Sequence, residues 1–176
     1  MMGTEMLAIV TFETDLGRCA VRWTDAGITS VLLPHRLGRP GPRIEDGVQI
    51  PTTIRQAIGG MTAVMAGEPR DLYDVVLDQR GVDPFRRVVY AATRQILPGT
   101  TRSYGEVARA IGLPEAARDV GAALARNPYP IVVPCHRVVA ASGRLHGFSA
   151  PGGIATKRRM LELEGAPGHG QQLLFG

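Results

Sequence analysis

"SYGEVARAIGLPEAARDVGAALARN", residues 103–127, contains the signals of two short helices joined by a tight turn. Ser103 and Glu106 form the pattern of a capping box, in which each side chain accepts a hydrogen bond from the other residue's backbone amide. A helix is therefore predicted from this box to Ile111, followed by a turn at GLPE and a second helix that ends before the Asn-Pro pair. This is a helix-turn-helix, although an ordinary αα-hairpin is commoner than one that reads DNA.

The second of these helices begins with small side chains. Ala116, Ala117 and Gly121 would let its backbone come close to a partner, and Arg118 projects from the same end. Close approach together with one long cation suits a nucleic-acid groove.

The chain divides near residue 80 in both pattern and charge. Residues 1–79 hold seven arginines against ten carboxylates, whereas residues 80–176 hold twelve arginines and Lys157 against six carboxylates. We therefore expect a domain at 1–79 and a second domain at 80–176. The basic second part favours a phosphate-bearing partner, and a solvated basic face is the alternative that charge alone leaves equally open.

The first part has the pattern of a small α/β unit. Alternating apolar residues predict strands at 6–14, 17–24 and 27–34. A loop rich in proline, glycine and arginine then precedes a helix predicted over 52–65, and a short strand at 73–78 closes the unit.

The second part begins with a helix. Asp83 and Pro84 form a start signal, because a proline at the first helical position loses no hydrogen bond. The apolar face of this helix is expected to run until PGT at 98–100, and it consists of Phe85, Val88, Val89, Ala92 and Ile96.

Two cysteines far apart in the chain argue against a disulfide framework. Cys19 and Cys135 are separated by most of the sequence, and the N-terminus has no pattern of a secretory signal. No apolar run reaches the roughly 20 residues needed to cross a bilayer. We expect a cytoplasmic protein without a membrane segment.

The segment NPYPIVVPCHRVV, residues 127–139, places a cysteine beside a histidine. In a regular strand Cys135 and His136 would lie on opposite faces, which excludes direct contact between thiol and imidazole. Transfer of the thiol proton through one bridging water remains within reach of a general base. The prolines predict an irregular, exposed turn, whereas a cysteine in an apolar strand is more often simply buried.

These segments together resemble the O6-alkylguanine-DNA alkyltransferases, also called methylated-DNA-protein-cysteine methyltransferases. The resemblance runs from about Pro84 to Gly165, through TRSYGEVARAIG, AARDVGAALARNPYPIVVPCHRVV, GRLHGFSAPGG and KRRMLELEG, and over the N-terminal third it is limited to the strand pattern around TDLG. It implies an α/β (α+β) fold. The small N-terminal α/β domain would have an antiparallel, ribonuclease-H-like sheet, and the mostly helical C-terminal domain a winged-helix-like helix-turn-helix.

The implied activity is direct-reversal DNA repair. A methyl or alkyl group would pass from O6-alkylguanine, or from O4-alkylthymine, to Cys135 in a single turnover. His136 would take the thiol proton through a water, Glu164 would orient the imidazole, and Asn127 would brace the turn. Tyr104 would donate to the base and make guanine a better leaving group.

The resemblance also implies how double-stranded DNA is held. The lesion would be extruded into a pocket while Arg118 takes its place in the stack, from the minor-groove side. The implied DNA contacts besides Arg118 are Ala116, Ala117, Gly121 and Ser103, and the implied pocket residues are Tyr104, Pro134, Val138, Phe148 and Ser149.

No cofactor or metal is implied. Cys19 and His35 are the only plausible zinc ligands in the N-terminal part, and structural zinc sites normally need four. A monomer is expected, cytoplasmic and associated with the nucleoid when bound to DNA. The sequence departs from the family pattern at Asp119, which puts a carboxylate on the DNA-facing helix, and in one loop at His146, Phe148 and Ala150-Pro151.

Two alternatives from other classes remain. The first is a non-catalytic, regulatory protein of the same superfamily that binds alkylated DNA, although such relatives replace the cysteine. The second is a cysteine hydrolase, which the adjacent Cys135 and His136 disfavour because hydrolases draw their histidine from elsewhere in the sequence.

Overall fold

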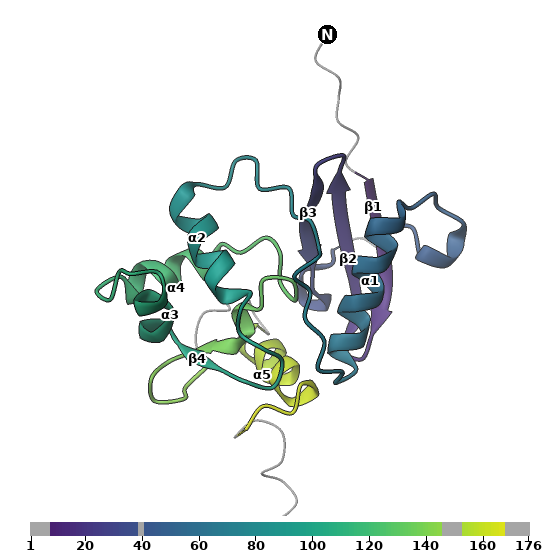
Figure 1. The fold of residues 1–176 in the computed structure, drawn as a ribbon. Helices are drawn as coiled ribbons and strands as arrows, with labels where there is room; N and C mark the ends of the chain where they lie inside the picture. Colours follow the sequence, from purple (N-terminus) through teal and green to yellow (C-terminus); the bar gives the residue numbers. More distant parts are fainter. Residues whose placement is uncertain (1–7, 39–40, 146–152, 168–176) are drawn as a thin grey trace, which may run out of the picture.

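A three-stranded antiparallel sheet lies beside a group of short helices, so the chain has the mixed α/β character that the sequence predicts (Figure 1). The computed structural model describes residues 8–38, 41–145 and 153–167. One cluster of buried apolar side chains extends from Val10 in the sheet to Met160 in the last helix. Within these described ranges no helix has the length and hydropathy needed to span a bilayer.

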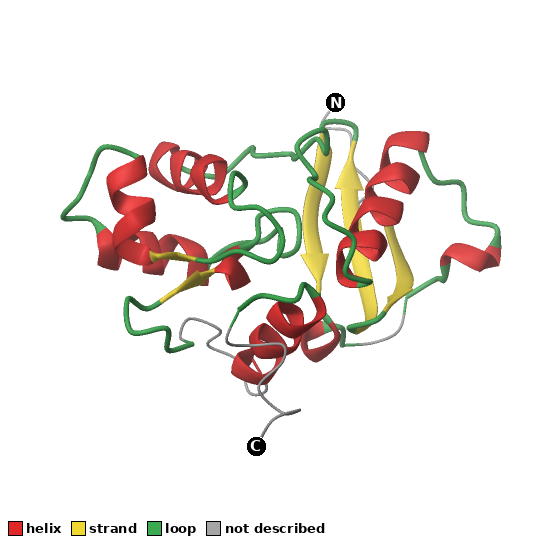
Figure 2. Ribbon diagram, turned by 60° about the horizontal axis from the view of Figure 1, so that its bottom comes forward, coloured by secondary structure: helices red, strands yellow, loops and turns green. Residues whose placement is uncertain are grey.

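The sheet consists of β1 (Ala8–Thr14), β2 (Gly17–Thr24) and β3 (Gly27–Leu32), in that order. Val21 in the central strand faces Val10 and Val31, and all three are buried. Helix α1 (Thr52–Met65) lies against one face of the sheet (Figure 2) and buries an apolar stripe. The predicted strands and this helix are confirmed, and the bounds of α1 are the predicted ones.

The strand predicted at 73–78 is wrong. Its segment runs beside β3 but exchanges only two hydrogen bonds with it, from the Ile28 amide to the Val76 carbonyl (3.0 Å) and from the Asp78 amide to the Ile28 carbonyl (2.8 Å). Gly27 permits this approach, because a Cβ there would lie 2.6 Å from the Val76 carbonyl oxygen. In the described chain this contact stays an isolated bridge. The Val76 side chain is 63% exposed rather than buried, and the Asp78 carboxylate binds Thr24 and Arg80.

The second half of the chain is helical, with two short strands among its helices (Figure 2). The capping box of the helix-turn-helix is confirmed: the Glu106 amide donates to the Ser103 hydroxyl (3.0 Å) and the Ser103 amide to the Glu106 carboxylate (2.6 Å). The elements are α2 (Pro84–Thr93), β4 (Arg102–Ser103), α3 (Tyr104–Ala110), α4 (Ala117–Ala125), β5 (Val138–Val139, parallel to β4) and α5 (Gly153–Leu163).

Helix α2 starts as predicted but ends earlier. The Asp83 carboxylate accepts from the Arg86 amide (3.0 Å), and the helix stops at Thr93 rather than at PGT. Val88, predicted for the buried face, is 49% exposed. The reason is a long-range contact: the Tyr90 hydroxyl donates to the Ala123 carbonyl of α4 (2.9 Å), which turns Tyr90 instead of Val88 toward the interior.

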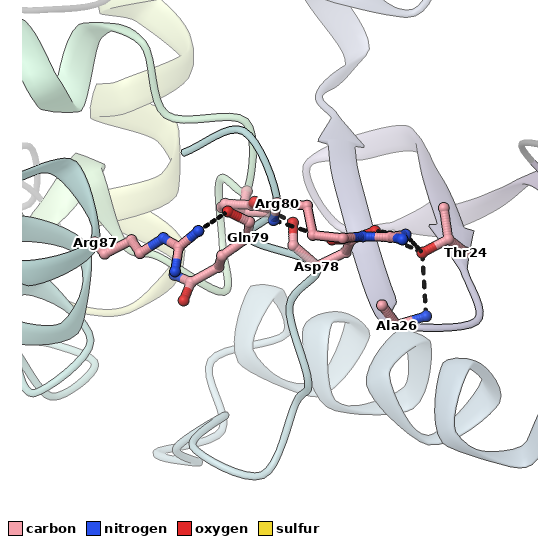
Figure 3. A network of polar contacts seen from close by, with 7 residues as sticks. Thr24, Ala26, Asp78, Gln79, Arg80 and Arg87 are labelled. Carbon is pink, nitrogen blue, oxygen red and sulfur yellow. Dashed lines mark hydrogen bonds and ion pairs between the residues drawn. The ribbon is translucent and has the colours of Figure 1, made fainter. Parts of the chain in front are cut away.

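A polar network holds the segment that joins the two halves (Figure 3). The Asp78 carboxylate accepts from the Thr24 hydroxyl (2.6 Å) and from the Arg80 guanidinium (2.7 and 2.9 Å), while Arg87 of α2 donates to the Gln79 carbonyl (2.8 Å). Hydrogen bonds from Arg80 keep the pKa of Asp78 well below its usual value, although burial acts in the opposite direction. The division into domains 1–79 and 80–176 stays a prediction.

Candidate active site

Cys135 lies on a short 3₁₀ turn, Cys135–Arg137, that follows an irregular run of chain. Asn127 braces this run, because its side-chain amide donates to the Val133 carbonyl (2.9 Å) and its carbonyl oxygen accepts from the Tyr129 amide (2.9 Å). Ile131 within the run has a φ of 74°, in the left-handed region that β-branched residues rarely adopt. The turn is therefore held in one shape by local hydrogen bonds.

The turn is irregular, as its prolines predict, but the expectation that it is exposed is wrong. Val132, Val133 and Pro134 are buried, and so is His136. Val132 and Val133 belong to the common cluster of buried residues, and the free energy gained by removing their apolar surface from water favours burial of the turn. Cys135 is half-buried.

His136 and Arg137 of this turn form a buried cluster with Glu164, which follows α5. His136 Nε2 lies 2.7 Å from Glu164 Oε1, and the Arg137 guanidinium binds both oxygens of the same carboxylate (2.7 and 3.0 Å). Burial alone would raise the pKa of Glu164, but the charges and hydrogen bonds of His136 and Arg137 lower it to about 2. Glu164 is therefore an anion at neutral pH.

The carboxylate fixes the tautomer of His136. Burial lowers the pKa of His136 below 6.5, against the opposing effect of Glu164, so the ring is neutral at neutral pH. An ionised carboxylate can only accept, so Nε2 carries the hydrogen and Nδ1 keeps its lone pair. Nδ1 is buried and has no hydrogen-bond partner among the described residues. It is a proton acceptor in the correct protonation state for a general base.

Lys157 of α5 is a buried cation that the sequence analysis missed. It is 1% exposed, and its Nζ donates to the Val138 carbonyl (2.7 Å) and lies 3.5 Å from the Tyr104 hydroxyl. Burial lowers its pKa to about 8. A signal was present, since the only lysine of the chain precedes Met160 and Leu161 at the spacing of a buried helix face.

Lys157 and Asn127 act on the thiol. Burial raises the pKa of Cys135, while the side-chain hydrogen bond of Asn127 and the charge of Lys157 oppose that rise. Burial also raises the pKa of Tyr104, which keeps its hydroxyl protonated and able to donate. The surroundings thus favour the neutral thiol, while the charge of Lys157 and the hydrogen bond of Asn127 can stabilise the thiolate when it forms.

A cavity of about 270 Å³ opens onto Cys135. Tyr104, Gly121, Asn127 and Lys157 line it. A Cβ at position 121 would lie 3.7 Å from the Tyr104 ring, an ordinary contact distance. Three of the predicted site residues thus meet the cysteine at one cavity. The other described lining residues are Ser30, Val31, Leu32, Leu33, His35, Arg36, Leu124, Ala125, Arg126, Pro128 and Pro130.

The remaining predicted pocket residues are placed differently. Pro134 and Val138 are buried beside the turn and are not among the lining residues, and Val138 instead offers its carbonyl oxygen to Lys157. Phe148 and Ser149 lie outside the described residues, as do His146 and the Ala150-Pro151 pair.

The predicted DNA-contacting residues lie at the N-terminal ends of the two helices of the helix-turn-helix. Arg118 is exposed in the first turn of α4, next to the half-buried Ala116 and Ala117, while the Ser103 hydroxyl is used in the capping box. Asp119 lines a separate hollow of about 330 Å³ with Arg86, Arg126 and Asp83.

Similarities to known proteins identify the family. The model of the 6-O-methylguanine DNA methyltransferase DNA-binding domain matches residues 84–166. The methylated-DNA-protein-cysteine methyltransferase of Mycobacterium tuberculosis is 50% identical over 114 residues, 65% of this chain and 67% of that protein. The protein of the same name from Methanosarcina acetivorans is 44% identical over 156 residues, 88% of this chain and 96% of that protein.

A solved structure agrees over both halves of the chain. The crystal structure of Mycobacterium tuberculosis OGT in complex with DNA has a TM-score of 0.71 at 38% identity, and the alignment covers 90% of this chain and 94% of that one. The chain belongs to the family of methylated-DNA-protein-cysteine methyltransferases. The resemblance and the mixed fold class are confirmed; the ribonuclease-H-like and winged-helix details stay predictions.

Proposed function

We propose that this protein repairs DNA by direct reversal, with Cys135 accepting the alkyl group of O6-alkylguanine, and of O4-alkylthymine, in double-stranded DNA. The observation that carries the proposal is the buried His136–Glu164 pair next to a thiol that lines a cavity. The lone pair on Nδ1 of His136 can accept the proton that the thiol has to lose at neutral pH. Family membership supports the same chemistry.

The reaction is a displacement at the alkyl carbon. The Cys135 proton passes through one water to Nδ1 of His136, and Glu164 stabilises the imidazolium. The thiolate then forms the sulfur-carbon bond while the carbon-O6 bond breaks, and the electron pair of that bond goes to guanine. Tyr104 donates a proton to the departing base, and the nearby Lys157 stabilises the phenolate that remains.

DNA meets the protein at the helix-turn-helix. Extruding a nucleotide from the duplex costs a few kcal/mol, and Arg118 on the exposed first turn of α4 offsets that cost by filling the vacated space in the stack. The small side chains at Ala116 and Ala117 let α4 approach from the minor-groove side, where width and backbone are read more than base sequence. Binding is therefore expected to show little sequence preference.

The product is a thioether, and no group near Cys135 in the described chain is suited to reverse it. The protein acts once, as a monomer and without a cofactor, in the cytoplasm and at the nucleoid. Residues 80–176 carry the reaction and DNA binding, and residues 1–79 form the N-terminal domain.

Intact mass measurement tests the proposal. Reduced protein is incubated with a duplex that contains one O6-methylguanine, and a gain of one methyl per molecule is expected on the Cys135 peptide. Cys135→Ala should abolish the gain and retain DNA binding. Cys19→Ala is the matched control and should keep the gain, because Cys19 is buried and burial raises its pKa to about 11.

Other outcomes would support other functions. Binding without any gain in mass would indicate a non-catalytic binder of alkylated DNA, and repeated turnover of an ester would indicate a cysteine hydrolase. Either result would overturn the proposal.

A further inference from the structure

The N-terminal part of the chain forms one side of the cavity that contains Cys135. Residues 30–36, which we call the β3 wall, comprise the end of β3 and the 3₁₀ turn Pro34–Arg36. Ser30, Leu33 and His35 of this wall line the cavity opposite α4 and the loop that follows it. The N-terminal part of the chain therefore borders the proposed reaction site.

Hydrogen bonds tie the β3 wall to both sides of the cysteine-bearing turn. The Val31 amide donates to the Pro128 carbonyl (2.8 Å), in the loop that leads to Cys135. His35 Nδ1 and the Thr156 hydroxyl are hydrogen bonded at 3.2 Å, one residue before Lys157 on α5. The wall is thus held in a fixed position relative to the nucleophile.

The polar network around Asp78 (Figure 3) adds a second connection between the sheet and the run of chain that precedes Cys135. Thr24 at the end of β2 binds the Asp78 carboxylate (2.6 Å), and the buried Tyr129 hydroxyl donates to the Asp78 carbonyl (2.6 Å). Tyr129 belongs to the run of chain that Asn127 braces. Sheet, joining segment and cysteine-bearing turn are therefore connected through Asp78.

We propose that the β3 wall, chiefly through His35, limits the size of the alkyl group that Cys135 accepts; this inference rests on the proposed function. In-line displacement aligns sulfur, carbon and O6, so any substituent on the carbon must project sideways into the cavity. The cavity volume of about 270 Å³ is close to the lower end of the roughly 300–1,000 Å³ of typical small-molecule pockets. A methyl group needs little of this space, whereas a benzyl group extends to the wall.

Two substitutions of opposite effect test the inference. Rate constants are measured for duplexes that contain O6-methylguanine or O6-benzylguanine. His35→Ala should raise the benzyl-to-methyl ratio of these rate constants by roughly tenfold, the scale of one methylene in an apolar pocket. Ser30→Leu should lower the ratio by a similar factor. Thr29→Val is the control, because Thr29 lies on the same strand, does not line the cavity and should leave the ratio unchanged.

Each outcome supports or overturns the inference. An unchanged ratio in both variants, or an equal loss on both substrates, would show that the wall is only structural. If His35→Ala does not fold, the direction of the Ser30→Leu effect decides. Failure of the wild type to take up methyl at all would instead overturn the proposed function, whatever the ratio.

Discussion

At the scale of single residues, the site is a buried arrangement of charges around one carboxylate. Glu164 accepts from His136 and Arg137 at once, and Arg137 also donates to the Ile96 carbonyl (2.7 Å). Removing one member of such a cluster leaves the others buried and uncompensated, which is the costly case for ion pairs. The cluster should therefore matter to folding as well as to proton transfer.

Glu164→Gln tests this double role. Removing the charge should lower the free energy of unfolding by roughly 3–5 kcal/mol. It should also slow alkyl transfer, because in the proposed mechanism the carboxylate stabilises the imidazolium and a neutral amide does so less well. The folded-state pKa of Glu164 is depressed to about 2, so its contribution is fully present above about pH 4.5 and is lost as pH falls toward 2. Denaturant unfolding at several pH values measures it.

Glu162→Gln is the matched control on α5. Glu162 pairs with Arg159 at 3.6 Å on the partly exposed side of the helix, and such pairs contribute about 0–1 kcal/mol. Equal losses of stability in the two variants would contradict the role given to Glu164.

Sequence motifs pointed to individual residues of the site but not to the residues that contact them. The adjacent cysteine and histidine, and the glutamate at the end of the chain's last helix, could be selected from motifs. Arg137 and Lys157 were missed because their importance lies in contacts across 27 residues, to Glu164, and across 53 residues, to Tyr104. Spacing along one helix or strand carries no information about such pairs.

At the scale of elements, local signals predicted what local interactions determine. The capping box at the start of α3 and the turn between β1 and β2 depend on side chains that bond backbone groups within three residues of them, and both are present. The course of α2 depends on the contact between Tyr90 and Ala123, which is distant in sequence. The strand expected at 73–78 is missing where the Asp78 carboxylate binds Thr24, which is also distant in sequence. Those two expectations failed for that reason.

Arg118→Ala tests the function of α4. In the proposed function the exposed guanidinium fills the space of an extruded nucleotide, so repair of duplex should slow by tenfold or more, while reaction with free O6-benzylguanine should change little. Rates on the two substrates are compared. Arg55→Ala, an exposed arginine on α1, is the control and should affect neither. Equal slowing on both substrates would contradict the proposed role of Arg118.

At the scale of the whole molecule, one cluster of buried side chains includes residues of the sheet and of the helices. A protein with such a shared core should unfold in one step. Trp23, the only tryptophan, reports the sheet, and circular dichroism at 222 nm reports the helices. We expect the two thermal transitions to coincide.

Asp78→Asn should lower the midpoint temperatures of both thermal transitions together. Loss of the charge weakens the bonds to Thr24 and Arg80, and because Arg80 is largely exposed we expect a cost of about 1–2 kcal/mol. Asp25→Asn, in the exposed turn between β2 and β3, should leave both transitions unchanged. Two separate transitions, or a shift in only one of them, would contradict a shared core.

The backbone of Ile131 has one more consequence. A left-handed conformation at a β-branched residue is unfavourable by about 1–3 kcal/mol and persists only where its surroundings leave no alternative. Here the side chain is 1% exposed, and removing a buried isoleucine costs about 2–5 kcal/mol, so glycine would not be an improvement. The backbone four residues before Cys135 is therefore fixed by its surroundings, and in the proposed reaction the alkylated base would have to move to the cysteine rather than the cysteine to the base.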